Sequence, residues 1–163
     1  MKAKAQIIPP NATGVRRLSP GKPVFDQAAL AKADAALAEM GGSFQQWLAN
    51  DIARLQGARV AADAQGWSAE TLEQVHDIAH DLKGLGATYG FPLATQIAAS
   101  LCRLIETEAG KAAVRANPAL ARAHVDAARA VVRAGVTSEE NSVGAALLAE
   151  LEAQVEALGV APE

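Results

Sequence analysis

The sequence predicts an all-α protein whose helices pack as an antiparallel, up-and-down bundle. Of its 163 residues, 39 are Ala and only six are aromatic. Ala has the most favourable helix propensity of all residues, whereas sheets favour aromatic and β-branched residues. No stretch alternates apolar and polar residues as a half-buried strand does. The connections between the expected helices are short, which favours antiparallel neighbours.

The first 25 residues differ from the rest of the chain. They hold four of the seven prolines and five basic residues with no acidic one, which leaves 10 basic residues against all 18 acidic residues in the remainder. Proline fixes φ and removes a hydrogen-bond donor, so no regular element is expected there. We therefore predict a flexible, basic, Pro-containing tail over 1–25 and a single helical domain over 26–163.

Glycines and capping residues divide that domain into its elements. They predict helices at about 26–39, 43–65, 69–89, 92–109 and 118–134, with a further C-terminal helix at about 142–158. Gly41-Gly42 is expected to end the first helix, and Ser43 to cap the second. Gly66 then separates the second helix from a third, which Ser68 caps.

The later boundaries follow from the same signals. Gly90 can adopt the left-handed conformation that closes a helix, and Pro92 suits the first turn of the next one. Gly110 is expected to end that fourth helix, and Asn117-Pro118 to open the fifth. Thr137 or Ser138 is expected to open the last helix.

Composition excludes several classes of protein. No window approaches eighteen consecutive strongly apolar residues, and the first residues lack the continuous apolar core of a secretory signal. A single Cys excludes an internal disulfide framework and a multi-Cys zinc site. The net charge of −3 argues against a general nucleic-acid binder. We expect a cytoplasmic protein that binds neither membrane nor nucleic acid.

The third helix contains the most informative residues. At about 100° per residue, its apolar side chains share one broad face that must be buried; these are Leu72, Val75, Ile78, Ala79, Leu82, Leu85 and Gly86. His80 lies nearly opposite the centre of that face and is therefore expected to be exposed.

The residues one turn after His80 point to chemistry at its ring. Gly84 is a mid-helix glycine, which costs about 1 kcal/mol relative to Ala, in a chain that otherwise uses Ala freely. Gly84 and Ala87 leave a shallow surface around the imidazole, and Lys83 places a cation beside it. A neutral imidazole is a nucleophile near pH 7, and a lysine can offset the charge of a phosphoryl group placed on it.

The run His80-Asp81-Leu82-Lys83-Gly84, followed by Gly90, resembles the signature of histidine phosphotransfer (HPt) domains. The resemblance covers about residues 40–110, with weaker support to about 134. It implies an antiparallel four-helix bundle, here with additional N- and C-terminal helices around an HPt-like core at about 40–134. The chain departs from the family pattern at Leu85-Gly86 and in the extra helix at about 142–158.

The resemblance also implies a function in two-component phosphorelays. His80 would accept and donate the phosphoryl group, Lys83 would stabilise its charge, and Gly84 would give the partner access. The partners would be response-regulator receiver domains, including the receiver of a hybrid histidine kinase. Those receivers would supply Mg²⁺, so that the chain needs no cofactor or metal of its own. We expect a monomeric carrier and not an ATP-dependent kinase, because the sequence has no Gly-rich phosphate loop.

Two other interpretations use the same sequence. His76 and His80 stand four residues apart and could bind a metal, with Glu106, Glu108 or His124 as a third ligand. Otherwise His76 lies at the bundle edge or tunes the polarity around His80. The chain could instead be a non-catalytic interaction or dimerisation module, whose interface would be an apolar stripe on the last helix formed by Leu147, Leu148, Leu151, Val155 and Leu158.

Four further residues are assigned structural places. Cys102 is expected to be a buried thiol, and His124 a surface residue among Arg122 and Arg129. Trp47 and Trp67 are expected to anchor the core and a loop.

Overall fold

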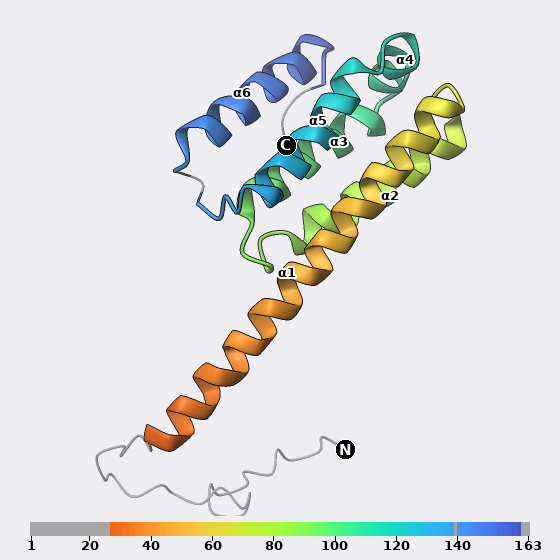
Figure 1. The fold of residues 1–163 in the computed structure, drawn as a ribbon. Helices are drawn as coiled ribbons and strands as arrows, with labels where there is room; N and C mark the ends of the chain where they lie inside the picture. Colours follow the sequence, from red (N-terminus) through yellow and green to blue (C-terminus); the bar gives the residue numbers. More distant parts are fainter. Residues whose placement is uncertain (1–26, 139, 161–163) are drawn as a thin grey trace, which may run out of the picture. The chain divides into compact units, whose positions relative to one another are not determined.

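The structure is a computed structural model that describes residues 27–138 and 140–160. For residues 37–40 it describes the backbone alone. The residues described form helices and no strand (Figure 1), which confirms the all-α prediction. The helices are α1 (Gln27–Ala64), α2 (Ala69–Leu85), α3 (Pro92–Glu106), α4 (Glu108–Ala116), α5 (Ala119–Arg133) and α6 (Ser142–Ala157). The predicted tail over 1–25 lies outside the described residues.

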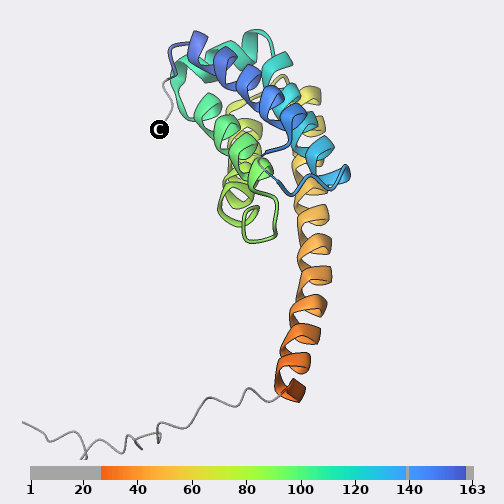
Figure 2. The same cartoon turned by 90° about the vertical axis from the view of Figure 1, so that its left-hand side faces the viewer.

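The chain divides into two units, 1–37 and 38–163, and the division falls inside α1. In the first unit, the described side chains of α1 are exposed, Leu30 among them. In the second unit, α3 is central and packs against α2, α4, α5 and α6. Figures 1 and 2 show α6 running alongside α5. Helix α3 supplies much of the core, with Ile97, Leu101 and Leu104 almost completely enclosed.

Helix α1 is continuous where the sequence predicted two helices. Gly41-Gly42 and Ser43 lie within it, so the predicted break over 39–43 is wrong. Two helical glycines cost about 2 kcal/mol relative to Ala. A break would leave up to four carbonyl and four amide groups without helical partners. Since Ala-rich helix flanks the glycines on their N-terminal side, continuing the helix costs less than ending and restarting it.

The prediction that Gly110 ends the fourth helix is also wrong. Helix α3 ends at Glu106 because Thr107 is extended, with φ −88° and ψ 149°. The Thr107 hydroxyl then accepts a hydrogen bond of 3.0 Å from the Gly110 amide, so Thr107 is the N-cap of α4. A Cβ on Gly110 would lie 1.7 Å from the Leu104 carbonyl oxygen. Gly110 therefore permits α4 to start directly against the end of α3.

Helix α2 ends at Leu85, one turn before the predicted end at Tyr89. A turn follows, in which the Phe91 amide donates to the Gly86 carbonyl at 2.9 Å. Gly90 has φ +86°, which confirms its expected left-handed conformation. A Cβ on Gly86 would lie 2.7 Å from the Thr95 hydroxyl oxygen, so the residue allows α2 and α3 to pack closely.

Helix α6 covers one flank of α3 and α5. From its apolar stripe, Leu151 and Val155 are buried, whereas Leu147 and Leu158 are 36% and 37% exposed. Gly144 also faces the bundle, where a Cβ would lie 2.3 Å from Leu93 Cδ2. The centre of the stripe is therefore part of the core of this unit.

Three residues differ from their predicted places. His124 is fully buried rather than on the surface, Trp47 is 51% exposed rather than in the core, and Leu85 is 42% exposed rather than on the buried face. The sequence contained a signal for His124, because it continues the helical spacing of the buried residues of α5: Ala121, Val125, Ala128 and Val131. Cys102 and Trp67 are buried as predicted.

The buried ring of His124 is held on both nitrogens. Nε2 lies 2.9 Å from the Ser100 hydroxyl, and Nδ1 lies 2.8 Å from the Leu120 carbonyl oxygen. A carbonyl can only accept, so in the neutral ring Nδ1 donates and Nε2 accepts from Ser100. Burial lowers the pKa of His124 below 6.5, against the opposing effect of the Leu120 hydrogen bond.

This lowered pKa predicts acid sensitivity. The unfolded chain binds a proton on His124 near pH 6.5, whereas the folded chain does not until a lower pH. The free energy of unfolding should therefore be highest above pH 6.5 and fall below it by up to about 1.4 kcal/mol per pH unit. Urea unfolding between pH 7.5 and 5.5 measures this slope. His124→Gln should be less stable but have a flatter profile, while an unchanged slope would contradict the assignment.

Asp63 connects three segments of the second unit. Its carboxylate accepts hydrogen bonds from Arg59 and Arg122, both at 2.8 Å, and from the Trp67 indole at 2.9 Å. Burial raises the pKa of this carboxyl, but the three donors outweigh that effect and lower it overall. Asp63 thus fixes the α1–α2 turn, where Trp67 has φ +54°, to helix α5.

Candidate functional site

Helix α2 places His80 on the surface of the bundle. The helix begins at Ser68, whose hydroxyl accepts a hydrogen bond of 3.3 Å from the Thr71 amide. It then buries one face, formed by Thr71, Leu72, Val75, Ala79 and Leu82. His80 lies outside this face and is exposed, as predicted. The imidazole is therefore accessible to a macromolecular partner.

The structure brings the predicted site residues together on one side of α2. Lys83 is half-buried one turn after His80, and Gly84 next to it is exposed. A Cβ on Gly84 would meet nothing within 4 Å, in contrast to Gly86. The packing of this protein thus requires Gly86 but not Gly84. The destabilising glycine beside His80 has no explanation in the fold itself.

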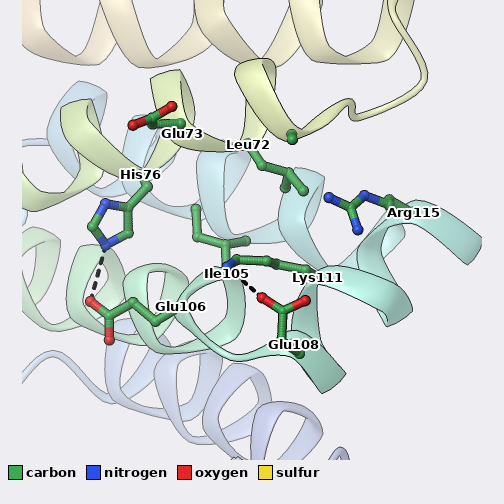
Figure 3. A pocket seen from close by; sticks show the side chains of 9 residues that line it. Leu72, Glu73, His76, Ile105, Glu106, Glu108, Lys111 and Arg115 are labelled. Atoms are coloured by element: carbon green, nitrogen blue, oxygen red, sulfur yellow. Dashed lines mark hydrogen bonds and ion pairs between the residues drawn. The ribbon is translucent and has the colours of Figure 1, made fainter.

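A second histidine lies one turn before His80. The ring centroids of His76 and His80 are 6.0 Å apart, with the ring planes at 31°. His76 Nε2 lies 3.0 Å from Glu106 Oε1, at the end of α3 (Figure 3). His76 and Glu106 lie at one end of a groove of about 570 Å³, with Lys111 of α4 near its middle and Arg115 of α4 at its far end. The sequence offered Glu106 only as a metal ligand, and its contact with His76 was not anticipated.

Exposed apolar side chains lie on the other side of α2. Trp47 packs edge-on against Phe44 and within 6.3 Å of the Tyr89 ring, measured between centroids. Together with Leu85 and Asp81, Trp47 and Tyr89 line a hollow of about 290 Å³ between α1 and α2. Asn50, Asp51 and Arg54 of α1 line the hollow as well, so its lining is part apolar and part charged. Asp81, which also lines it, follows His80 directly in the sequence.

The metal-site interpretation is not supported by the side-chain positions. Among the side chains that the structure describes, no three of His, Cys, Asp or Glu are grouped so as to hold a metal ion. His124 is enclosed in the core, away from solvent, and Glu106 is engaged with His76. Over the same residues, no helix has the length and apolar character needed to cross a bilayer.

A helical bundle that exposes one histidine beside a lysine and an open glycine has the arrangement of a histidine phosphotransfer domain. The family model of the Hpt domain matches residues 39–161, and the chain belongs to this family. It is thus a domain of phosphotransfer in two-component signalling. The match includes α6, which the resemblance in the sequence had left outside the family core. No curated protein and no solved structure matches the chain.

Proposed function

We propose that the chain relays a phosphoryl group between receiver domains through His80. The exposed imidazole of His80, on a rigid helix and without bulk at Gly84, carries this proposal. The lone pair of one ring nitrogen attacks the phosphorus of a receiver's aspartyl phosphate. The N–P bond forms while the O–P bond breaks, and the aspartate leaves as a carboxylate with the bonding electron pair. The reverse step then passes the group to a second receiver.

The neighbours of His80 have distinct roles in this proposal. Lys83 stabilises the negative charge of the phosphoryl group, which carries nearly two charges at neutral pH. Gly84 leaves room for the face of the receiver that contains its aspartate. The hollow lined by Trp47, Leu85 and Tyr89 together with charged residues of α1 offers a contact surface next to the site. These residues position the reactants, and positioning with charge neutralisation is what phosphoryl transfer chiefly needs.

The proposal extends to partners and cofactors. The donors and acceptors are response-regulator receivers, including the receiver of a hybrid histidine kinase. Mg²⁺ belongs to the receiver, and this chain contributes none. The carrier acts as a monomer in the cytoplasm. The monomeric state is supported by Leu151 and Val155 of the apolar stripe, which are buried in the core of the chain itself.

Phosphotransfer from purified receivers tests the function. Receivers phosphorylated with a small phosphodonor and Mg²⁺, without ATP, are incubated with the full chain, and intact mass is recorded at neutral pH. The expected result is one acid-labile phosphoryl group per chain with loss of label from the receiver. Failure to acquire label from any member of a broad receiver panel would overturn the proposal.

Gly84→Gln should slow the transfer while the protein stays folded. The longer side chain would stand where the receiver approaches, but its Cβ would meet nothing within the chain itself. Gln also has a better helix propensity, so the free energy of unfolding should rise by up to about 1 kcal/mol. Quench-flow transfer over a range of receiver concentrations measures the rate, with Gly57→Gln as the control because Gly57 is likewise exposed in a helix with open space around it. Equal rates for both variants would show that Gly84 does not serve access.

A further inference from the structure

The ring of His76 is held in place by a contact between two helices. Glu106 comes from α3, thirty positions along the chain, and its Oε1 lies 3.0 Å from His76 Nε2. The other ring nitrogen, Nδ1, lies 3.7 Å from Asp77 Oδ1. The His76 side chain is 28% exposed, so solvent reaches a ring that is nevertheless fixed. Each nitrogen therefore faces a carboxylate and can carry a proton.

The other charged groups around His76 come from the groove. Glu73 lies one turn earlier on α2 and lines the groove as well. From α4, Glu108 is engaged with Lys111 at 2.9 Å, and Arg115 stands at the far end (Figure 3). The carboxylates that contact His76 are thus Glu106 and Asp77, while Lys111 has a carboxylate partner of its own. A positive charge on the His76 ring would thus have Glu106 within hydrogen-bond distance at 3.0 Å and Asp77 within ion-pair distance at 3.7 Å.

Phosphorylation would change the charge of this region. A phosphoryl group brings nearly two negative charges to His80. Lys83 supplies one positive charge on the side of the following turn. On the side of the preceding turn, the ring of His76 is 6.0 Å from that of His80, between ring centroids. Histidine is the side chain that ordinarily gains a proton between pH 8 and 5.

We infer that His76 is a charge-compensating residue, which takes up a proton from solvent when His80 carries a phosphoryl group. This inference rests on the proposed function of His80. Glu106 is its positioning residue, because it holds the ring one turn from His80 and pairs with the added charge. The phosphorylated carrier consequently binds more protons than the free carrier, so acidification shifts the phosphoryl group from receiver to His80.

The equilibrium constant for phosphoryl exchange with one receiver tests this linkage. It is measured from both directions at pH 6.0, 7.5 and 9.0 for the full chain and for His76→Gln, whose amide can still donate to Glu106. Because the receiver and His80 are the same in both measurements, their own pH dependence cancels in the ratio of the two constants. We expect a ratio of about three to ten in favour of the natural chain at pH 6.0, and a ratio of one at pH 9.0, where an imidazole is neutral.

Two carboxylate variants provide the matched comparison. At pH 6.0, Glu106→Gln should lower the exchange constant of the chain, as His76→Gln does. Glu108→Gln, in the same groove but engaged with Lys111, should leave that constant unchanged. A ratio for His76→Gln that does not vary with pH would overturn the inference while leaving the relay through His80 intact. If the natural chain took no label at all, both the relay through His80 and the charge compensation by His76 would be overturned.

Discussion

His80→Gln is expected to abolish phosphorylation completely while the protein remains folded. The chain has three histidines, of which His80 is exposed, His76 is half-buried and His124 is fully buried. Glutamine has no nucleophilic ring nitrogen, so no N–P bond can form. Because the side chain lies outside the buried face of α2, the free energy of unfolding should change by no more than about 0.5 kcal/mol. Intact mass after incubation with phosphorylated receivers, and urea unfolding, measure the two effects.

The other histidines provide the controls for this experiment. His76→Gln should still take the label, because His76 has no part in forming the bond. His124→Gln should also take it wherever the variant is folded, since a ring enclosed in the core cannot reach a receiver. Label on His80→Gln would place the phosphoryl group elsewhere. A loss of stability above about 1 kcal/mol in that variant would show that His80 supports the core.

Gly110→Ala is expected to destabilise the protein by about 3 kcal/mol, or to prevent folding. The added Cβ would lie 1.7 Å from the Leu104 carbonyl oxygen and 2.8 Å from its carbonyl carbon. Both are backbone atoms within the last turn of α3, so no side-chain rotation relieves the overlap. The start of α4 would have to move away from α3, and the cap between Thr107 and Gly110 would be lost with it. Urea unfolding at pH 7.5 measures the change.

Gly84→Ala is the matched control, with the opposite expected sign. Its Cβ would meet nothing, and replacing an exposed helical glycine by Ala should stabilise the protein by about 1 kcal/mol. The comparison separates the general effect of glycine on helices from the specific contact at Gly110. If Gly110→Ala proved as stable as the natural chain, that result would show that α4 does not start as close to the end of α3 as described.

The parts of the fold that follow from local chemistry could be predicted from the sequence. The cap at Ser68, the left-handed Gly90 and most of the buried face of α2 (Leu72, Val75, Ala79 and Leu82) each depend on a few neighbouring residues, and the structure has all of them. The exposure of His80 followed from the same helical periodicity. One helix and its two ends determine these features, so residue spacing was enough to predict them.

The features that were missed depend on contacts between elements. Gly41-Gly42 does not end a helix, because helix on both sides makes an interruption more costly than two glycines. Leu85 falls on the apolar side of α2 but borders the hollow beside Trp47, which no helical wheel can show. The contact of His76 with Glu106 joins residues thirty positions apart, and periodicity contains no information about such a pair.

The hydrogen bond between Arg122 and Asp63 has a consequence for the order of folding. It closes a loop between residues 59 positions apart, and the entropy lost on closing a loop increases with its length. Helices α2 and α3, in contrast, are joined by a short turn at Gly90 and can pair at little entropic cost. We therefore expect the α2–α3 hairpin, which carries His80, to form early, and the Asp63 junction to close after α5 has docked.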